Sequence, residues 1–173
     1  GQWISINQNT LLARGGQSMV LNGSGFDPSP GVSYSCEFVS SSDSSTSLTT
    51  VGQVSGNSVT CQSPAWNRYV ESASLRLLRG SETVHFAGLA GVDLIDFVTG
   101  WDSADVSSGS AGGGETIMIR GFGFNRLQTY ACNFSNSDDW MMGTISVLDS
   151  SRLECSTPVW GSMYEQATTV LNV

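Results

Sequence analysis

Side chains able to carry out acid–base, nucleophilic or metal chemistry are few in this 173-residue sequence. His85 is the only histidine, and the alternation of residues around it predicts a strand. A Ser-His-Asp, Cys-His or zinc site needs a histidine next to a nucleophile, a carboxylate or further ligands, and no such motif surrounds His85. We therefore expect a packed or surface strand residue here rather than a general base.

Three pairs of carboxylates remain as candidates for hydrolysis or ion binding: Asp93 and Asp96, Asp102 and Asp105, and Asp138 and Asp139. The first pair flanks a predicted strand and the last lies in a predicted loop, so neither has the form of a glycosidase acid and base. The middle pair lies in a Gly/Ser-rich loop that lacks the spacing of an EF-hand. We expect no catalytic residues, no metal site, no cofactor and no enzymatic activity.

The charge balance is acidic, and it excludes several classes of partner. All seven basic residues are arginine, 15 residues are acidic, and the net charge is −8. Nucleic acids and anionic membrane surfaces require clustered Lys and Arg, so we expect neither as a partner. No apolar run approaches ~18 residues, so no membrane insertion is expected in this segment. Because the sequence begins with Gly1 rather than Met, we expect a mature or trimmed product.

An internal duplication organises the sequence. A Gly-Gly-x-x-apolar-x-apolar-x-Gly-x-Gly-Phe pattern occurs twice, and two further blocks follow each copy in the same order, Tyr-x-Cys-x-Phe and Cys-x-Ser/Thr-Pro-x-Trp. The three matching pairs are 15–26 with 113–124, 34–38 with 130–134, and 61–66 with 155–160. Three ordered matches indicate a tandem duplication.

The four cysteines occupy equivalent places in the two repeats. Alternation places Cys36 and Cys61 on the inward faces of their predicted strands, and Cys132 and Cys155 likewise. We expect a Cys36–Cys61 and a Cys132–Cys155 disulfide, each stabilising its repeat by roughly 3 kcal/mol in the chain-entropy model. The alternative is four reduced, buried thiols of a cytosolic protein.

Short alternating segments separated by Gly, Ser, Asn, Asp and Pro predict an all-β protein of two tandem immunoglobulin-like sandwiches. We place domain one at residues 1–90 and domain two at residues 91–173. Expected strands lie at 3–6, 18–22, 33–39, 48–54, 58–62, 73–78 and 83–87, and then at 94–99, 116–120, 130–135, 142–148, 152–156 and 167–173.

Each half resembles an IPT/TIG domain in the three blocks described above, over essentially the whole chain. The resemblance implies an immunoglobulin-like sandwich. Extracellular members form stalks of surface receptors, and intracellular members include dimerisation modules of transcription factors. The paired cysteines resemble the extracellular branch, whereas the absence of lysine departs from the DNA-binding branch. The expected location is therefore extracellular or on the cell surface.

Several residues are candidates for contacts or modification. Trp66 and Trp160 recur at one shared position, which favours a packing role. Trp101 and Trp140 have no counterpart in this alignment and are candidates for an intermolecular contact. The sequons at Asn22 and Asn133 fall on the outward sides of their strands, and we expect N-linked glycans there.

Repeat two is expected to lack its last strand, because residues 170–173 align with 76–79 while residues 83–87 have no counterpart. An exposed edge can be completed by strand addition from another chain. The expected donor is the segment 2–7 of a neighbour. The assembly residues are then Trp3, Ile4, Ile6, Leu171 and Val173, along with Trp101 and Trp140. The alternative is a longer parent chain that supplies the strand itself.

Two functions fit these expectations. The first is a non-enzymatic structural subunit or segment of an extracellular fibre, filament or stalk, assembled as a homo-oligomer by strand donation. The second is a protein- or glycan-binding module of a larger surface receptor.

Overall fold

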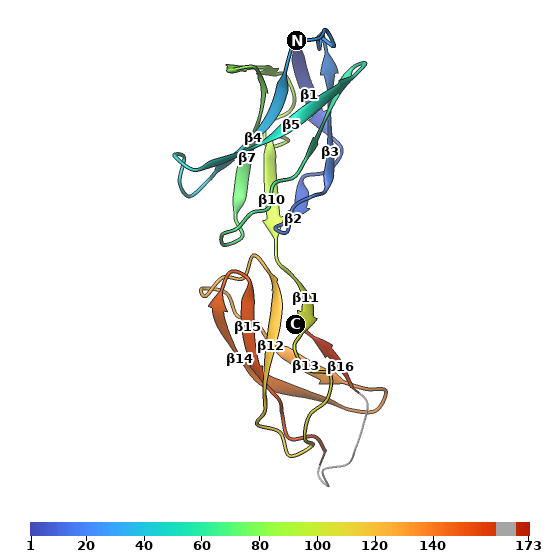
Figure 1. The fold of residues 1–173 in the computed structure, drawn as a ribbon, viewed down its shortest axis with the longest axis vertical. Helices are drawn as coiled ribbons and strands as arrows, with labels where there is room; N and C mark the ends of the chain where they lie inside the picture. The colour runs from blue at the N-terminus through green and yellow to red at the C-terminus, as the bar shows by residue number, and fades with distance from the viewer. Residues whose placement is uncertain (162–168) are drawn as a thin grey trace. The chain divides into compact units, whose positions relative to one another are not determined.

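A computed structural model describes residues 1–161 and 169–173, and its secondary structure is entirely β. The chain divides into two compact units, Gly1–Val98 (domain 1) and Thr99–Val173 (domain 2). Each domain carries one disulfide, Cys36–Cys61 or Cys132–Cys155. The expected fold class is confirmed, because the chain forms two tandem β domains (Figure 1) with one internal disulfide each.

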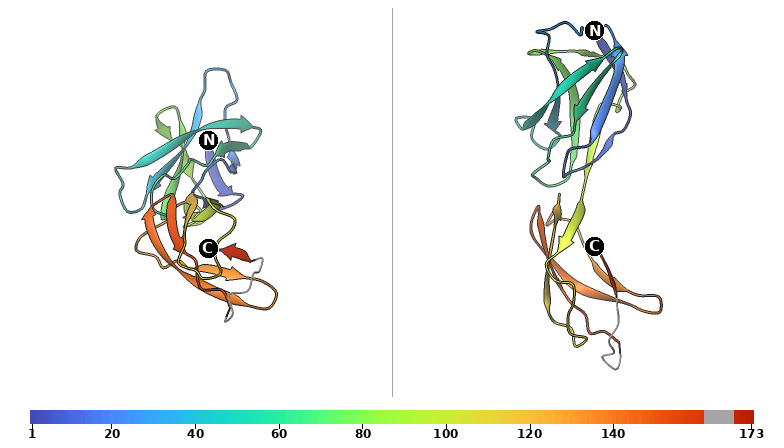
Figure 2. Two further views of the ribbon diagram at one scale, coloured as in Figure 1. Left: turned by 60° about the horizontal axis from the view of Figure 1, so that its bottom comes forward. Right: turned by 45° about the vertical axis from the view of Figure 1, so that its right-hand side comes forward.

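Domain 1 is built from ten strands in the spatial order β2-β10-β7-β4-β5-β6-β3-β1-β9, with β8 paired to β7. Their bounds are β1 Gln2–Ile6, β2 Thr10–Leu12, β3 Ser18–Ser24, β4 Tyr34–Ser40, β5 Ser47–Ser55, β6 Ser58–Gln62, β7 Ser72–Arg79, β8 Glu82–Thr83, β9 His85–Phe86 and β10 Leu94–Val98. Figure 2 shows from two further sides how the strands of each domain curl around its core.

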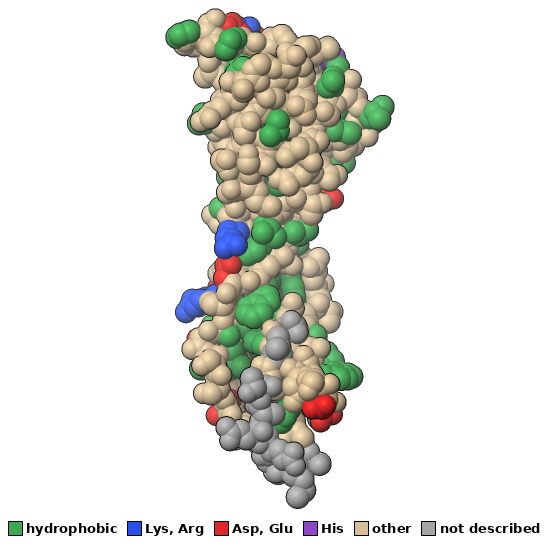
Figure 3. Space-filling view, turned by 90° about the vertical axis from the view of Figure 1, so that its right-hand side faces the viewer, with side chains coloured by type: hydrophobic (Ala, Val, Ile, Leu, Met, Phe, Trp, Pro, Cys, Tyr) green, Lys and Arg blue, Asp and Glu red, His purple; other side chains and the backbone are tan. Residues whose placement is uncertain are grey.

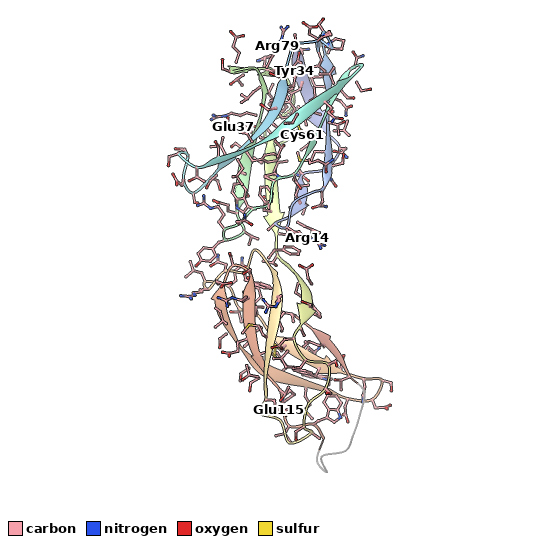
Figure 4. All side chains as sticks on the ribbon, viewed as in Figure 1. Arg14, Tyr34, Glu37, Cys61, Arg79 and Glu115 are labelled. Atoms are coloured by element: carbon pink, nitrogen blue, oxygen red, sulfur yellow. A yellow bond between two sulfur atoms is a disulfide. The ribbon has the colours of Figure 1, made fainter. Side chains whose placement is uncertain are left out.

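The disulfide of domain 1 shows that the sheet is strongly curved. Cys36 lies on β4 and Cys61 on β6, and β5 lies between these strands in the sheet. Neighbouring strands are ~4.8 Å apart, so strands two apart in a flat sheet would be separated by roughly 10 Å. The two Cα atoms are 6.2 Å apart, and both cysteines are buried. The sheet therefore folds back on itself around the sulfur atoms, which lie in the core (Figure 4).

Domain 2 repeats the pattern with six strands in the order β11-β12-β15-β14-β13-β16. Their bounds are β11 Gly100–Ala104, β12 Thr116–Phe122, β13 Cys132–Ser135, β14 Trp140–Asp149, β15 Arg152–Ser156 and β16 Val170–Asn172. The buried core consists of alternate residues of these strands with one loop aromatic: Ile117, Ile119, Phe124, Cys132, Phe134, Leu153 and Cys155.

The boundary between the domains lies after Val98, not after Ala90. Strand β10 had been expected to open the second repeat, but it pairs antiparallel with β7 and parallel with β2, both in domain 1. Its inward residues Ile95 and Phe97 are buried in domain 1. The first strand of domain 2 is therefore β11, and only Thr99 separates it from β10.

This change in boundary makes Trp101 the equivalent of Trp3. Trp3 pairs with Gly23 and Trp101 pairs with Gly121, and an irregularity in the pairing follows each tryptophan at the same place. The expectation that Trp101 has no counterpart in the first repeat is therefore wrong. The duplication extends to the first strand of both domains.

The paired glycines that open the repeated block hold the chain close to another loop. Gly15 and Gly113 have φ values of +81° and +68°. A Cβ atom on either would come within 2.5 Å of backbone atoms, at Ala65 or Pro158 respectively. The positive φ angle and the close backbone contact both favour glycine at these positions. The Gly-Gly pair and the Ser/Thr-Pro-x-Trp motif therefore recur together because their backbones touch.

The N-terminal strand is part of the domain 1 core rather than a free segment. Strand β1 pairs with β3 and β9, and Trp3 is 1% exposed with its ring 4.3 Å from that of Phe86. The expectation that residues 2–7 lie free for donation is therefore wrong. The alternating pattern that suggested a donor strand is the pattern of a strand already paired.

We predict that Trp3→Ala lowers the free energy of unfolding of domain 1 by ~3–5 kcal/mol, because it removes a large buried ring. Ile4→Ala is the matched control on the same strand, since Ile4 is 46% exposed, and it should cost much less. Urea denaturation that resolves the domain 1 transition measures both. Equal losses for the two variants would contradict the placement of β1.

The turn between β14 and β15 is stabilised by charge. Hydrogen bonds from the Arg152 guanidinium and the Ser151 N–H lower the pKa of Asp149 from 3.8 to about 2. The Arg152 Nη2 atom lies 2.6 Å from Asp149 Oδ2. A carboxylate with a depressed pKa stabilises the fold above the unfolded value, and this contribution is lost as the pH falls from about 4 towards 2.

We expect Arg152→Gln to raise the pKa of Asp149 from about 2 towards 3.8, since the largest cause of the shift is removed. Arg76→Gln in domain 1 is the control and should leave Asp149 unchanged. An NMR titration of the Asp149 side-chain carboxyl carbon measures both. An Asp149 that titrates at the wild-type pH in Arg152→Gln would refute this explanation.

Candidate assembly and interface surfaces

The residues with catalytic potential are not brought together. His85 is exposed on β9, and no group of three His, Cys, Asp or Glu side chains able to hold a metal ion occurs among residues 1–161 and 169–173. Charged side chains are few and scattered on the face shown in Figure 3.

Two of the candidate carboxylates have structural partners instead. Asp105 Oδ1 accepts a hydrogen bond from Met118 N at 2.8 Å, and Asn7 Oδ1 accepts the equivalent bond from Val20 N at 2.8 Å in domain 1. Asp96 Oδ1 on β10 accepts a hydrogen bond from Ser72 Oγ on β7 at 2.5 Å. The duplicated bond gives Asp105 a role in fastening the chain after β11 to β12.

The Ser-rich loop 40–47 is anchored by Glu71. Ser40 Oγ donates to both carboxylate oxygens of Glu71 at 2.9 Å, and Ser42 N donates to Oε2 at 3.1 Å. Burial raises the pKa of Glu71, but the hydrogen bonds from Ser42 and Ser40 outweigh it and leave the pKa below its usual value. The loop is therefore held by a carboxylate and its hydroxyl donors rather than left as an open connector.

Exposed apolar side chains identify one candidate contact surface in domain 2. Trp140 is 63% exposed on β14, and Met142, two residues further along the same strand, also points outward. Alternate residues of a strand share a face, so these two side chains form a continuous apolar surface. The alignment of Met142 with Leu48 in the first repeat predicts a core residue, but Met142 is 54% exposed. Trp140 keeps its proposed role as an intermolecular contact.

A second set of exposed positions becomes apparent when the two domains are compared. Trp101 is 36% exposed whereas its equivalent Trp3 is 1% exposed. Trp160 is partly exposed whereas its equivalent Trp66 is buried. Sequence comparison missed this contrast because it treated Trp101 as unique and Trp160 as a simple packing residue.

The C-terminal strand of domain 2 takes the place of β7, in a shifted alignment. Leu171 pairs with Phe134, and Leu75 pairs with Phe38 in domain 1. Residues 170–173 therefore match 74–77, not 76–79 as expected. Leu171 and Val173 are partly buried and pack against the core of domain 2. Their role in assembly stays a prediction, and the part of the expected strand at 167–168 lies outside the described residues.

The two sequons differ in accessibility. Asn22 is exposed on β3, as expected. Asn133 is only partly exposed on β13, and its Oδ1 atom is buried without a hydrogen-bond partner in the described structure. The glycan would attach to Nδ2 of a side chain that is less accessible than that of Asn22, so modification of Asn133 stays a prediction.

We predict that a eukaryotic secretory host modifies Asn22 far more completely than Asn133. Glycopeptide mapping measures the occupancy of each site, and Asn22→Gln should remove most of the carbohydrate mass. Asn133→Gln is the matched control and should change the mass little. Equal occupancy at the two positions would show that the lower exposure of Asn133 does not limit modification.

Among the described residues, none belongs to a helix long and apolar enough to span a membrane.

No family model matches the sequence, and no curated protein matches it either. Solved structures match at low identity. A structure of the full extracellular region of plexin A4 aligns with 92% of this chain at 9% identity and a TM-score of 0.37, covering 13% of that chain. A second plexin A4 structure aligns with 91% at 13% identity and a TM-score of 0.33, covering 23% of that chain. The crystal structure of S. aureus TarS aligns with 91% at 9% identity and a TM-score of 0.33, covering 35% of that chain. This chain thus spans 35% or less of the length of each of these three chains.

Proposed function

We propose that this chain is a non-enzymatic structural segment of an extracellular fibre, filament or stalk. The observation that carries the proposal is the duplication of one β domain, each copy closed by its own disulfide. Disulfides form and persist in oxidising compartments, and they are rare in the cytosol. The resemblance of both halves to extracellular IPT/TIG domains supports the same reading.

The connection between the two domains fits a structural role. Strand β10 is the last strand of domain 1, and β11 follows after one residue, Thr99. A tension applied to the chain would therefore pass directly from a paired strand of one domain to a paired strand of the next. The disulfides limit how far each domain can lengthen, since residues 36–61 and 132–155 cannot be pulled out while the bonds hold.

Assembly is the second part of the proposal. We infer that domain 2 joins a neighbouring protein of the fibre by strand addition at the outer edge of β16. The N-terminal donor expected from the sequence is replaced, because β1 is already paired within domain 1.

A binding module of a larger surface receptor is the second candidate function. The exposed Trp140 and Met142 surface favours it, because aromatic and methionine side chains are enriched at the centres of protein interfaces. A glycan or protein array probed with the wild-type chain and with Trp140→Ala separates the candidates. Saturable capture that Trp140→Ala abolishes would favour the receptor module.

The proposed function predicts where the protein lies in the cells that make it. Immunogold electron microscopy with antibodies against domain 1 should label an extracellular fibre or stalk at repeated intervals. Antibodies blocked with the purified chain are the control. Label confined to the cytosol, or spread over a surface without any fibrous structure, would overturn the proposal.

A second prediction concerns the disulfides under force. Reduction should lengthen the chain released when each domain unfolds by roughly 80 Å, because about 25 further residues become extensible at ~3.3–3.6 Å each. Single-molecule force spectroscopy with and without reductant measures this increment. A release of the same length in both conditions would contradict the placement of the two bonds inside the domains.

A further inference from the structure

The first and last segments of domain 1 lie side by side and run in the same direction. Strand β1 pairs parallel with β9, and β2 pairs parallel with β10. In the second pair Thr10 lies directly opposite Asp96. We call these two successive contacts, made by residues 2–12 with residues 85–98, the terminal clamp.

Backbone hydrogen bonds continue both contacts past the ends of the strands. Three such bonds join the two segments at 2.8–2.9 Å: Ala87 N donates to Trp3 O, Asp96 N to Asn9 O, and Ala13 N to Val98 O. The last bond reaches the final residue of domain 1. The two segments are therefore joined from the start of the domain to its end.

Buried side chains lie beside the same hydrogen bonds. At the first contact the ring of Trp3 lies 4.3 Å from that of Phe86. At the second contact Phe97 is opposite the fully buried Leu11, and its ring stacks on Trp66 at 4.4 Å. A hydrogen bond is electrostatically stronger where water is excluded, so these rings increase the resistance of the strands to separation.

The direction of the strands decides how tension acts on these bonds. Tension along the chain pulls the N-terminal segment at Gly1 and the C-terminal segment after Val98. Because the segments are parallel, these two points lie at opposite ends of the clamp (Figure 1). The evenly spaced bonds of a parallel pair are then loaded together, in shear.

An antiparallel arrangement of the same two segments would respond differently. The start of one strand would then lie beside the end of the other, and tension would peel the pair apart one bond at a time. Strand β10 does have an antiparallel neighbour, β7, but β7 lies inside the domain and is not a terminal segment. Tension along the chain therefore acts on the parallel pairs.

We propose that the terminal clamp sets the mechanical strength of domain 1. The barrier to unfolding under tension is the simultaneous separation of residues 2–13 from residues 85–98, and the buried rings of Trp3 and Phe97 form its apolar part. The rest of the sheet opens after this step. The proposal rests on the proposed function, because a segment of a fibre or stalk is a setting in which the chain carries tension.

A metal bridge across β2 and β10 tests the clamp in the full chain. Thr10 and Asp96 are direct partners and both are exposed, so Thr10→His combined with Asp96→His places two imidazoles side by side. Imidazole is a ligand for Ni²⁺, and the bridge holds the strands together only while the ion is bound. The chain is stretched between Gly1 and Val173 at constant force, with and without Ni²⁺.

The matched control places the same metal site between β4 and β5. Ser35 and Val51 are direct partners there, in the middle of the sheet and outside the clamp. Ni²⁺ should raise the free energy of unfolding in urea for Ser35→His combined with Val51→His, as it does for the clamp variant. Both variants therefore gain equilibrium stability, and only the response to tension separates them.

The unfolding step of domain 1 can be recognised because it is the longer domain and releases the longer chain. Ni²⁺ should lengthen the lifetime of domain 1 in the clamp variant about tenfold, because forced unfolding is governed by the unfolding rate. It should leave the lifetime of the control variant unchanged. Equal lengthening in both variants, or none in a clamp variant that Ni²⁺ stabilises in urea, would overturn the proposal.

The pulling direction gives a second test that needs no substitution in the clamp. A handle on an azide-bearing residue in place of Ser81, in the exposed turn between β7 and β8, is paired with one at Gly1. These handles pull β1 and β9 apart at the same end. The lifetime at equal force should be about a hundredfold shorter than with handles at Gly1 and Val173, since the bonds open in turn. Equal lifetimes in the two directions would overturn the proposal.

The outcome is distinct from that of the proposed function. A clamp that fails these tests leaves the proposed function intact if immunogold labelling decorates an extracellular fibre or stalk. A cytosolic label would overturn that function even where the clamp resists tension.

Discussion

A strand at the border of a β-sheet needs partners for its backbone, and this requirement shapes both domains. Unpaired N–H and C=O groups at an exposed edge are sites for the addition of another strand. Domain 1 meets the requirement with one segment, β8 to β10, which pairs with β7 on one side of the domain and with β1 on the other. The same segment places Phe86 and Phe97 over the tryptophans of the core.

Domain 2 has an equivalent core, but no segment among its described residues covers the outer edge of β16. The disulfide, the buried cysteines and the alternation of β12, β13 and β15 are all present. Differences lie at the residues that the segment would cover, on β11, on β16 and at Trp160, and also at residues 108–110, which form no strand where domain 1 has β2. The duplicated sequence thus contains its own control, because one copy displays the occupied site and the other displays the exposed one.

Much of the fold could be predicted because its signals are local and repeated. Alternation around Cys36 and Cys132 placed these residues inward, and the duplication of the pattern identified the disulfide pairs. The assignment of residues 94–98 failed for a physical reason. Their alternation is the same whichever domain they serve, and the choice depends on pairing with residues 72–74, about twenty residues earlier in the chain. Long-range pairing of this kind leaves no local signature.

The candidate site was only half predictable for the same reason. An exposed edge was expected in domain 2, but the expected donor was β1, whose pattern does not distinguish a free strand from a paired one. The relation of Trp101 to Trp3 appeared only once β11 was found to occupy the position of β1. Trp140 was singled out because its counterpart in the first repeat is polar; the structure leaves it exposed, and its contact role stays a prediction.

Hydrogen exchange at two equivalent amides tests the central claim most directly. The amide of Leu75 donates to Asp93 O, and Leu171 is the residue of β16 equivalent to Leu75 by its pairing with Phe134. In the isolated chain we predict strong protection of Leu75 and exchange at Leu171 close to the rate of an unstructured peptide, with protection appearing at Leu171 when a strand is added. An amide of Leu171 that is already as protected as that of Leu75 in the chain alone would contradict the account.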